Sequence, residues 1–298
     1  MNLPQKVSIT EVGPRDGLQN IKTWIPTETK LAIIDGLVGA GLKKIEVTSF
    51  VHPAAIPQMA DSAVVLPAVK QKYSGQVEFV ALAPNLFGAA KAIELGADEI
   101  TYVVSASERH NMENTRQTIA DSLSALKKVC EIKPELTVRL VVATSFVCPF
   151  AGKIEPDQVA RVIEAGLAAG AKEIALGDTI GKAHPLHVET LLTYLQARFS
   201  EVDFILHLHD TYGMGLASIM PALNMGIARY ETSVGGLGGC PFAPGAAGNI
   251  ATEDLVNMLH EMNIETGIDL LALVNVARMI DKVIPMSVNG HMIKVGCR

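Results

Sequence analysis

The 298-residue sequence predicts a (β/α)₈ barrel, also called a TIM barrel, with a C-terminal helical extension. Short apolar runs alternate along the chain with amphipathic helical patterns, which is typical of a parallel sheet covered by helices. Eight such units follow one another, and a barrel of this type typically needs about 250 residues. No G-x-G-x-x-G motif follows the first apolar run, which disfavours the main alternative, an open doubly wound sheet.

Each of the first four units pairs a predicted strand with a predicted helix. The strands are VSITEVG from residue 7, KKIEVTSF from 43, VEFVALAP from 77 and DEITYVVS from 98. The helical patterns after them cover residues 27–40, a segment that starts near 61, residues 85–96 and residues 114–131. These strands are mostly apolar, as is typical of a parallel sheet with both faces covered.

The last four units continue the same alternation. Their strands are LTVRLVVAT from residue 136, KEIALGDT from 172, VDFILHLHD from 202 and YETSVGG from 230. Their helices cover residues 155–170, 185–199, 215–226 and 252–262. A further helical pattern at 270–283 lies beyond the eighth unit. Because no Pro-, Gly- or Ser-rich linker divides the chain, we expect one domain over 1–298, with the barrel at about 5–262 and the extension at about 263–298.

The composition indicates a folded protein with a sizeable hydrophobic core. Hydrophobic residues make up 49%, the mean hydropathy is +0.28, and the net charge is −6. We see no Lys/Arg cluster for nucleic acid and no apolar run long enough to span a membrane. The predicted first strand leaves no room for a signal peptide, and four scattered cysteines argue against a disulfide framework, so we expect a cytoplasmic protein. The C-terminal extension could pack on a second copy as a homo-oligomer (dimer).

Two histidines end the seventh predicted strand, in HLHDTYG at 207–213. Side chains at i and i+2 of a strand share a face, and catalytic residues of such barrels lie at the carboxyl ends of strands. His207 and His209 could therefore bind one metal ion, although two hydrogen-bonded core histidines are an equal alternative. A second pair, His184 and His187, starts a predicted helix with no converging acid, and we expect these to be structural or surface residues.

Polar residues also gather at the ends of the first and second strands. EVGPRDGLQN at 11–20 follows an apolar strand directly, although GPRDG alone could be a surface turn. Glu46 lies inside the otherwise apolar KKIEVTSF. A buried carboxylate needs a cation, and Arg15 on the adjacent strand end is its expected partner.

The eighth unit contains a glycine-rich loop, GGLGGCPFAPGAAGN at 235–249. A flexible connector is one interpretation, and a lid that brings Cys240 to the barrel mouth is the other. The amide oxygen of Asn249 could complete a metal site with Asp16, His207 and His209. Such a mixed N and O ligand set suits Mg²⁺ or Mn²⁺, with Zn²⁺ or Co²⁺ as further candidates.

Seven segments together resemble one enzyme family, the 3-hydroxy-3-methylglutaryl-CoA lyases, which are metal-dependent barrels with an Asp-Arg-Glu signature. The resemblance runs from about residue 5 to 285. The segments are EVGPRDGLQN, IEVTSFVHPAAIPQMAD, LAPNLFG, SASE, LGDTIG, HLHDTYG and GLGGCPFAPGAAGNIATEDLV.

The resemblance implies a divalent cation, an acyl-CoA thioester substrate, and the products acetyl-CoA and a β-keto acid such as acetoacetate. It implies that Arg15 faces the thioester carbonyl, that Glu46 orients Arg15, and that Cys240 is the catalytic loop cysteine. The implied metal ligands are Asp16, His207, His209 and Asn249. The predicted catalytic residues are Arg15, Asp16, Glu46, His207 and Cys240. The predicted substrate-binding residues are Arg15, Gln19, Ser49 and Asn85.

Several segments depart from the family pattern. In ATSFVCPFAG at 143–152, Phe146 and Val147 are bulkier than expected and Ala151 replaces an acidic residue; SERHNMEN at 107–114 and His52 also differ. A citramalyl-type thioester or a longer 3-alkyl analogue therefore stays open as the substrate. Two other functions are weighed: a Claisen-condensing relative that joins acetyl-CoA to a 2-oxo acid, and a non-enzymatic barrel that binds a metal or CoA ester. Cys297 is either a thiol switch or an ordinary exposed thiol.

Overall fold

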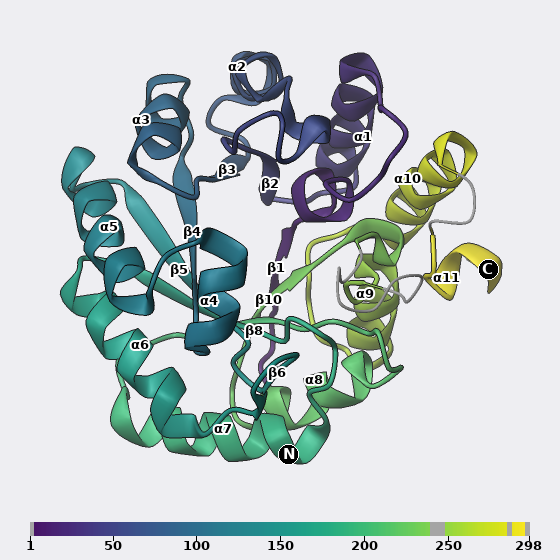
Figure 1. Ribbon diagram of the computed structural model, residues 1–298. Coiled ribbons are helices and arrows are strands. Elements are labelled where there is room, and N and C mark those ends of the chain that lie inside the picture. The colour runs from purple at the N-terminus through teal and green to yellow at the C-terminus, as the bar shows by residue number, and fades with distance from the viewer. Residues whose placement is uncertain (1–2, 239–247, 285–287, 296–298) are drawn as a thin grey trace.

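Eight parallel strands close into a barrel in which the first and last strands pair with each other (Figure 1). The computed structural model describes residues 3–238, 248–284 and 288–295, so Cys240 and Cys297 lie outside the described residues. The order around the barrel is β1-β10-β9-β8-β5-β4-β3-β2, which confirms the predicted fold class. The strands are β1 (Ser8–Glu11), β2 (Lys44–Ser49), β3 (Glu78–Leu82), β4 (Glu99–Ser105), β5 (Thr137–Ala143), β8 (Glu173–Gly177), β9 (Ile205–His207) and β10 (Arg229–Thr232).

Helices surround the strands on the outside of the barrel (Figure 1). They are α1 (Thr27–Gly39), α2 (Ser62–Tyr73), α3 (Leu86–Glu94), α5 (Ile119–Ile132), α6 (Pro156–Ala168), α7 (Pro185–Arg198), α8 (Gly215–Asn224) and α9 (Thr252–Glu261). The predicted C-terminal extension forms α10 (Leu270–Val283) and α11 (Met292–Val295). Gly36 lets α10 pack closely on α1, because a Cβ at Gly36 would lie 2.7 Å from Val276. Among the helices in the described ranges, none has the length and apolarity that a membrane span requires.

The fourth unit differs from the prediction of one long helix at 114–131. It contains two helices, α4 (Glu108–Thr115) and α5, separated where Arg116 adopts a left-handed conformation with φ 58°. Each helix has its own cap, since Ser107 accepts a hydrogen bond at the start of α4 and Thr118 does so at the start of α5. The predicted start at Asn114 was therefore wrong, because these two caps lie at positions that the apolar periodicity does not mark.

The interior of the barrel contains a buried network of charged side chains. Arg139 on β5 is fully buried and contacts Glu99 on β4 and Glu231 on β10. Lys44 on β2 reaches Glu99 as well, at 2.5 Å. Because β5 and β10 are not neighbours in the barrel order, the contact between Arg139 and Glu231 crosses the interior. A β-hairpin of β6 (Val147–Cys148) and β7 (Gly152–Lys153) follows β5.

Candidate metal centre and active site

Three predicted ligands meet at the carboxyl ends of β1 and β9. Asp16, His207 and His209 each offer a ligand atom, and these atoms all lie within 4.8 Å of one another. The two imidazole Nε2 atoms are 3.2 Å apart, and Nε2 of His207 is 4.0 Å from Oδ2 of Asp16. Both histidines are only 9% exposed. This group is able to hold a metal ion, and in the described part of the chain it is the one such group of His, Cys, Asp and Glu side chains.

The segment that carries Asp16 is a buried π-helical turn, η1 (Gly13–Gly17), rather than a surface turn. Glycine is needed at its start, since a Cβ on Gly13 would lie 2.6 Å from Oε1 of Glu11. Glu11 accepts hydrogen bonds from the backbone N–H of Gly13, at 2.7 Å, and of Val234, at 2.8 Å. It also accepts one from the hydroxyl of Thr252, at 2.7 Å. Glu11 thereby ties η1 to the segment that follows β10.

Arg15 lies between two carboxylates. Its Nε donates to Oε2 of Glu46 at 2.5 Å, and its Nη1 donates to Oδ1 of Asp16 at 2.6 Å. The predicted contact between Glu46 and Arg15 is therefore confirmed. Arg15 is 7% exposed and Glu46 is 1% exposed. Burial works to lower the pKa of Arg15, but the two carboxylates together raise it above its ordinary value, so the guanidinium stays charged.

The electrostatics place the three ligands in the protonation states that a metal ion requires. Burial works to raise the pKa of Asp16, but the charge of Arg15 and the other neighbouring groups outweigh it and lower that pKa. Burial lowers the pKa of His207 to about 3 and also lowers the pKa of His209. At neutral pH the carboxylate is therefore charged and both imidazoles are neutral, as metal binding demands.

The fourth predicted ligand, Asn249, is adjacent to this group. It is 1% exposed, and it pairs with His209 in an isolated antiparallel bridge. Its Nδ2 donates to Oδ2 of Asp16 at 2.7 Å and to the carbonyl of Leu237 at 3.0 Å, while its Oδ1 has no hydrogen-bond partner in the described part of the chain. An amide oxygen together with two imidazoles and a carboxylate is a set of donor types that fits a divalent cation. In this structure the nitrogen, not the oxygen, faces Asp16.

The predicted substrate-binding residues occupy different settings. Gln19 donates to Oδ1 of Asp16 at 3.0 Å, so it lies at the centre. Ser49 ends β2, is 1% exposed, and has a hydroxyl with no hydrogen-bond partner in the described ranges. Asn85 caps α3, since its Oδ1 accepts from the N–H of Gly88 at 2.9 Å. The structure thus brings Gln19 to the candidate metal ligands and gives Asn85 a local structural contact.

The other histidine pair has the structural setting that the sequence indicated. His184 caps α7, because its Nδ1 accepts from the N–H of His187 at 3.3 Å. The two rings stack with their centroids 3.7 Å apart. One site neighbour was missed from the sequence: Oε2 of Glu231 lies 2.8 Å from Nδ1 of His207. The sequence contained a signal for this contact, because Glu231 is a carboxylate inside the predicted strand YETSVGG, just as Glu46 is inside KKIEVTSF.

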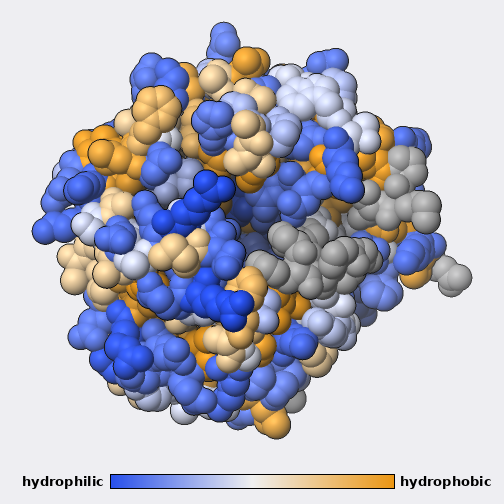
Figure 2. Space-filling view, in the orientation of Figure 1, coloured by the Kyte–Doolittle hydropathy of each residue, from blue (hydrophilic) through white to orange (hydrophobic). Residues whose placement is uncertain are grey.

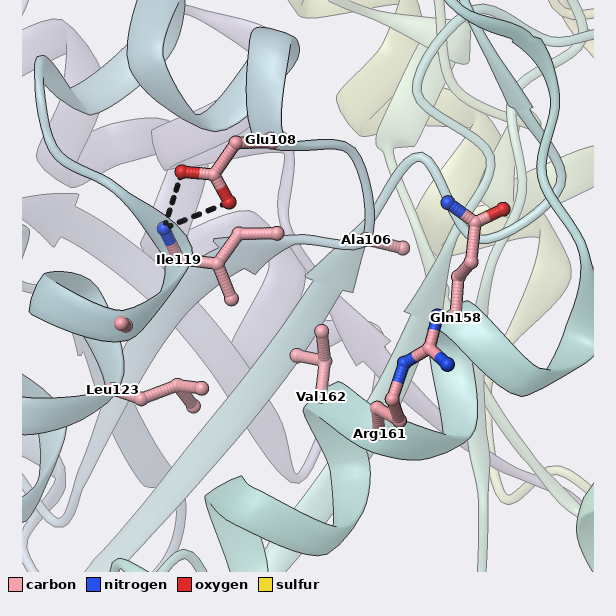
Figure 3. A pocket seen from close by; sticks show the side chains of 8 residues that line it. Ala106, Glu108, Ile119, Leu123, Gln158, Arg161 and Val162 are labelled. Atoms are coloured by element: carbon pink, nitrogen blue, oxygen red, sulfur yellow. Dashed lines mark hydrogen bonds between the residues drawn. The ribbon is translucent and has the colours of Figure 1, made fainter.

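The surface has a hollow on one face (Figure 2) and a separate cavity between two of the helices. Figure 2 shows a hollow near the middle of the face that Figure 1 presents, bordered by hydrophilic side chains. A separate cavity of about 410 Å³ lies between α5 and α6 (Figure 3). Its floor is apolar, with Leu123 and Val162, and Glu108 at its edge accepts from the N–H of Ile119. None of the candidate metal ligands lines this cavity, so it is distinct from the candidate metal centre.

The fold and the site together define a TIM-barrel protein with a candidate metal centre at the end of the barrel where such proteins carry their active sites. The HMGL-like family model matches residues 6–280, and the chain belongs to this family. It is 45% identical over 284 residues to hydroxymethylglutaryl-CoA lyase YngG of Bacillus subtilis, covering 95% of this chain and 94% of that protein. It is 40% identical over 298 residues to the mitochondrial hydroxymethylglutaryl-CoA lyase of Mus musculus, covering 99% and 91%.

Solved structures agree with the sequence relatives. The crystal structure of the Bacillus subtilis HMG-CoA lyase has a TM-score of 0.95 and 44% identity, with 99% of each chain covered. An HMG-CoA lyase from Acinetobacter baumannii in complex with coenzyme A and 3-methylmalate has a TM-score of 0.93 and 40% identity, covering 98% of this chain and 95% of that one. The resemblance found in the sequence is therefore confirmed.

Proposed function

We propose that this protein cleaves 3-hydroxy-3-methylglutaryl-CoA to acetyl-CoA and acetoacetate with the help of a divalent metal ion. The observation that carries the proposal is the placement of the buried Arg15–Glu46 pair beside Asp16, which in turn adjoins His207 and His209. This arrangement offers a cationic group and a metal-capable group to one substrate. The names of the relatives at 40–45% identity support the same reaction.

The reaction is a retro-Claisen cleavage. The tertiary hydroxyl at C3 loses its proton, the C2–C3 bond breaks, and C3 becomes the ketone carbon of acetoacetate. The electron pair of the broken bond forms a thioester enolate, and a proton added to its carbon gives acetyl-CoA. The protein must therefore accept one proton, stabilise one enolate oxygen and donate one proton.

The side chains at the centre can perform these tasks. Asp16, whose carboxylate is in its basic form at neutral pH, accepts the hydroxyl proton, and His207 serves as a ligand. Arg15 stabilises the enolate oxygen, and Glu46 fixes its orientation. Cys240, which lies outside the described residues, donates the proton to the enolate carbon. Asp16, His207, His209 and Asn249 would hold a divalent cation, with Mg²⁺ or Mn²⁺ favoured by the ligand types; such an ion lowers the pKa of a substrate hydroxyl and fixes its geometry.

The acyl specificity is part of the proposal. Phe146, one of the bulky departures from the family pattern, is 3% exposed and belongs to the hydrophobic core. Its bulk is therefore accommodated by packing, so this departure gives no reason to prefer a longer 3-alkyl substrate over the ordinary 3-methyl one. We also propose a cytoplasmic homodimer, on the basis of the scattered cysteines and the C-terminal helices. Light scattering of the purified protein measures the oligomeric state.

A substrate panel tests the proposed activity. The protein is treated with a chelator, reloaded with Mn²⁺ or Mg²⁺, and incubated with 3-hydroxy-3-methylglutaryl-CoA, a longer 3-alkyl analogue and citramalyl-CoA, with products identified by mass. A parallel reaction with acetyl-CoA and 2-oxo acids tests for condensation. We expect acetyl-CoA and acetoacetate from the first substrate. Preferential turnover of another thioester, condensation, or binding without turnover would each contradict the proposal.

A further inference from the structure

The two ring nitrogens of His207 have different surroundings. Nε2 faces His209 and Asp16, whereas Nδ1 is 2.8 Å from Oε2 of Glu231. Glu231 is directly opposite His207 in the register of β10 and β9. It is 3% exposed. The strand pairing therefore holds this carboxylate against the side of the imidazole that points away from the other candidate ligands.

The second oxygen of Glu231 is also bound. Oε1 accepts a hydrogen bond from Nη1 of Arg139, which has no solvent exposure. Arg139 donates from its Nε to Oε1 of Glu99 at 2.6 Å, and Oε2 of Glu99 accepts from Nζ of Lys44 at 2.5 Å. A buried carboxylate paired with a guanidinium is favoured as the charged form, which can only accept hydrogen bonds.

A carboxylate that only accepts imposes one tautomer on its neighbour. Because Glu231 has no proton to donate, Nδ1 of His207 must carry the hydrogen, and Nε2 is left with its lone pair. We propose that Glu231 is a positioning residue that fixes His207 as the Nδ1–H tautomer, with Nε2 ready to bind a metal ion, and that Arg139 holds Glu231 in place. The metal-binding consequence rests on the proposed function, whereas the tautomer can be measured without metal.

Replacing Glu231 with glutamine reverses the hydrogen bond. Arg139 has only donors, so the amide oxygen of the new side chain must face the guanidinium. The amide NH₂ then faces Nδ1 of His207 and donates to it, which places the ring hydrogen on Nε2. With a hydrogen on Nε2, this nitrogen no longer has a free lone pair with which to bind the metal. Loss of the hydrogen bond that holds the other ring nitrogen of a metal-binding histidine typically lowers metal affinity about 10–100-fold.

The chain offers a matched control in Glu99→Gln. Glu99 is 2% exposed and contacts the same guanidinium, but it has no hydrogen bond to His207 among those of the described residues. The control therefore also removes one negative charge from the buried network around Arg139. If Glu231 contributed only to the network, both variants would lower metal affinity equally.

Two measurements on full-length protein decide the proposal. Nitrogen-15 NMR of the metal-free form reports which nitrogen of His207 is protonated, with the signal assigned by its loss in His207→Gln. Competition with a chromogenic chelator gives the Kd for Mn²⁺. We expect the Nδ1–H tautomer in wild type and Glu99→Gln, the Nε2–H tautomer in Glu231→Gln, and a 10–100-fold rise in Kd for Glu231→Gln alone.

The outcomes separate this inference from the proposed function. An Nε2–H tautomer in the wild-type protein would overturn the inference even if Glu231→Gln failed to fold. Equal Kd values for the two glutamine variants would overturn it as well. Wild-type protein that binds no Mn²⁺ but shows the expected tautomers would support the positioning role and reject the metal requirement.

Discussion

Replacing Arg15 with methionine should reduce both stability and turnover, for two separate reasons. The stability effect comes from Glu46, which is 1% exposed and whose Oε1 already has no hydrogen-bond partner in the described ranges. Methionine leaves this buried carboxylate without its cation. Removing one partner of a buried ion pair costs about 3–5 kcal/mol. The turnover effect comes from the enolate, since one lost electrostatic contact to developing charge lowers kcat about 10²–10³-fold.

A double variant distinguishes these effects. Arg15→Met combined with Glu46→Gln removes the unpaired charge, so urea unfolding of the metal-free proteins should show most of the lost free energy restored. Turnover should stay low, because the cation that faces the thioester is still absent. Metal affinity should change little in either variant. Near-wild-type kcat in Arg15→Met would show that Arg15 is structural, and an unchanged free energy of unfolding would refute the pairing argument.

Three further experiments test the site and its surroundings. Extensive chelation should abolish turnover and Mn²⁺ or Mg²⁺ should restore it; full activity of rigorously metal-free protein would reject the metal proposal. Cys240→Ser should bind substrate and metal nearly as the wild type does but turn over far more slowly, because an alcohol is a weaker acid than a thiol, and an acyl group trapped on Cys240 would instead indicate a nucleophile. Burial raises the pKa of Glu253 to about 8, so the folded state binds its proton more tightly than the unfolded state does. Glu253 should therefore contribute a loss of stability as the pH rises from about 4.5 to about 8, and Glu253→Gln should make the pH dependence of thermal unfolding shallower than in the wild type, where Glu11 and Asp178 also contribute.

The sequence was sufficient for the barrel and for much of the centre. Residues i and i+2 of a strand share a face, and the carboxyl ends of parallel strands meet, so His207, His209 and Asp16 could be brought together without coordinates. The contact between Glu46 and Arg15 followed from the cost of burying an unpaired carboxylate.

Other features depend on contacts that no local pattern encodes. The break between α4 and α5 depends on a left-handed Arg116, a conformation that a non-glycine residue adopts only when its surroundings favour it. The orientation of Asn249 and the contact between Glu231 and His207 depend on strand register and on side-chain rotation. The hydrophobic periodicity of the sequence predicts neither strand register nor side-chain rotation.

The pairing of β1 with β10 has a consequence for how the chain is made. Asp16 and Asn249 are 233 positions apart, and β1 gains its second neighbour only when residues 229–232 have been synthesised. Until then, one edge of β1 has no partner strand, and exposed edges invite pairing with other chains. A fragment that stops before residue 249 lacks one of the proposed ligands, whatever its own fold. A metal ion that binds all four would therefore stabilise only molecules whose two distant segments have met, and it would protect finished chains rather than nascent ones from proteolysis.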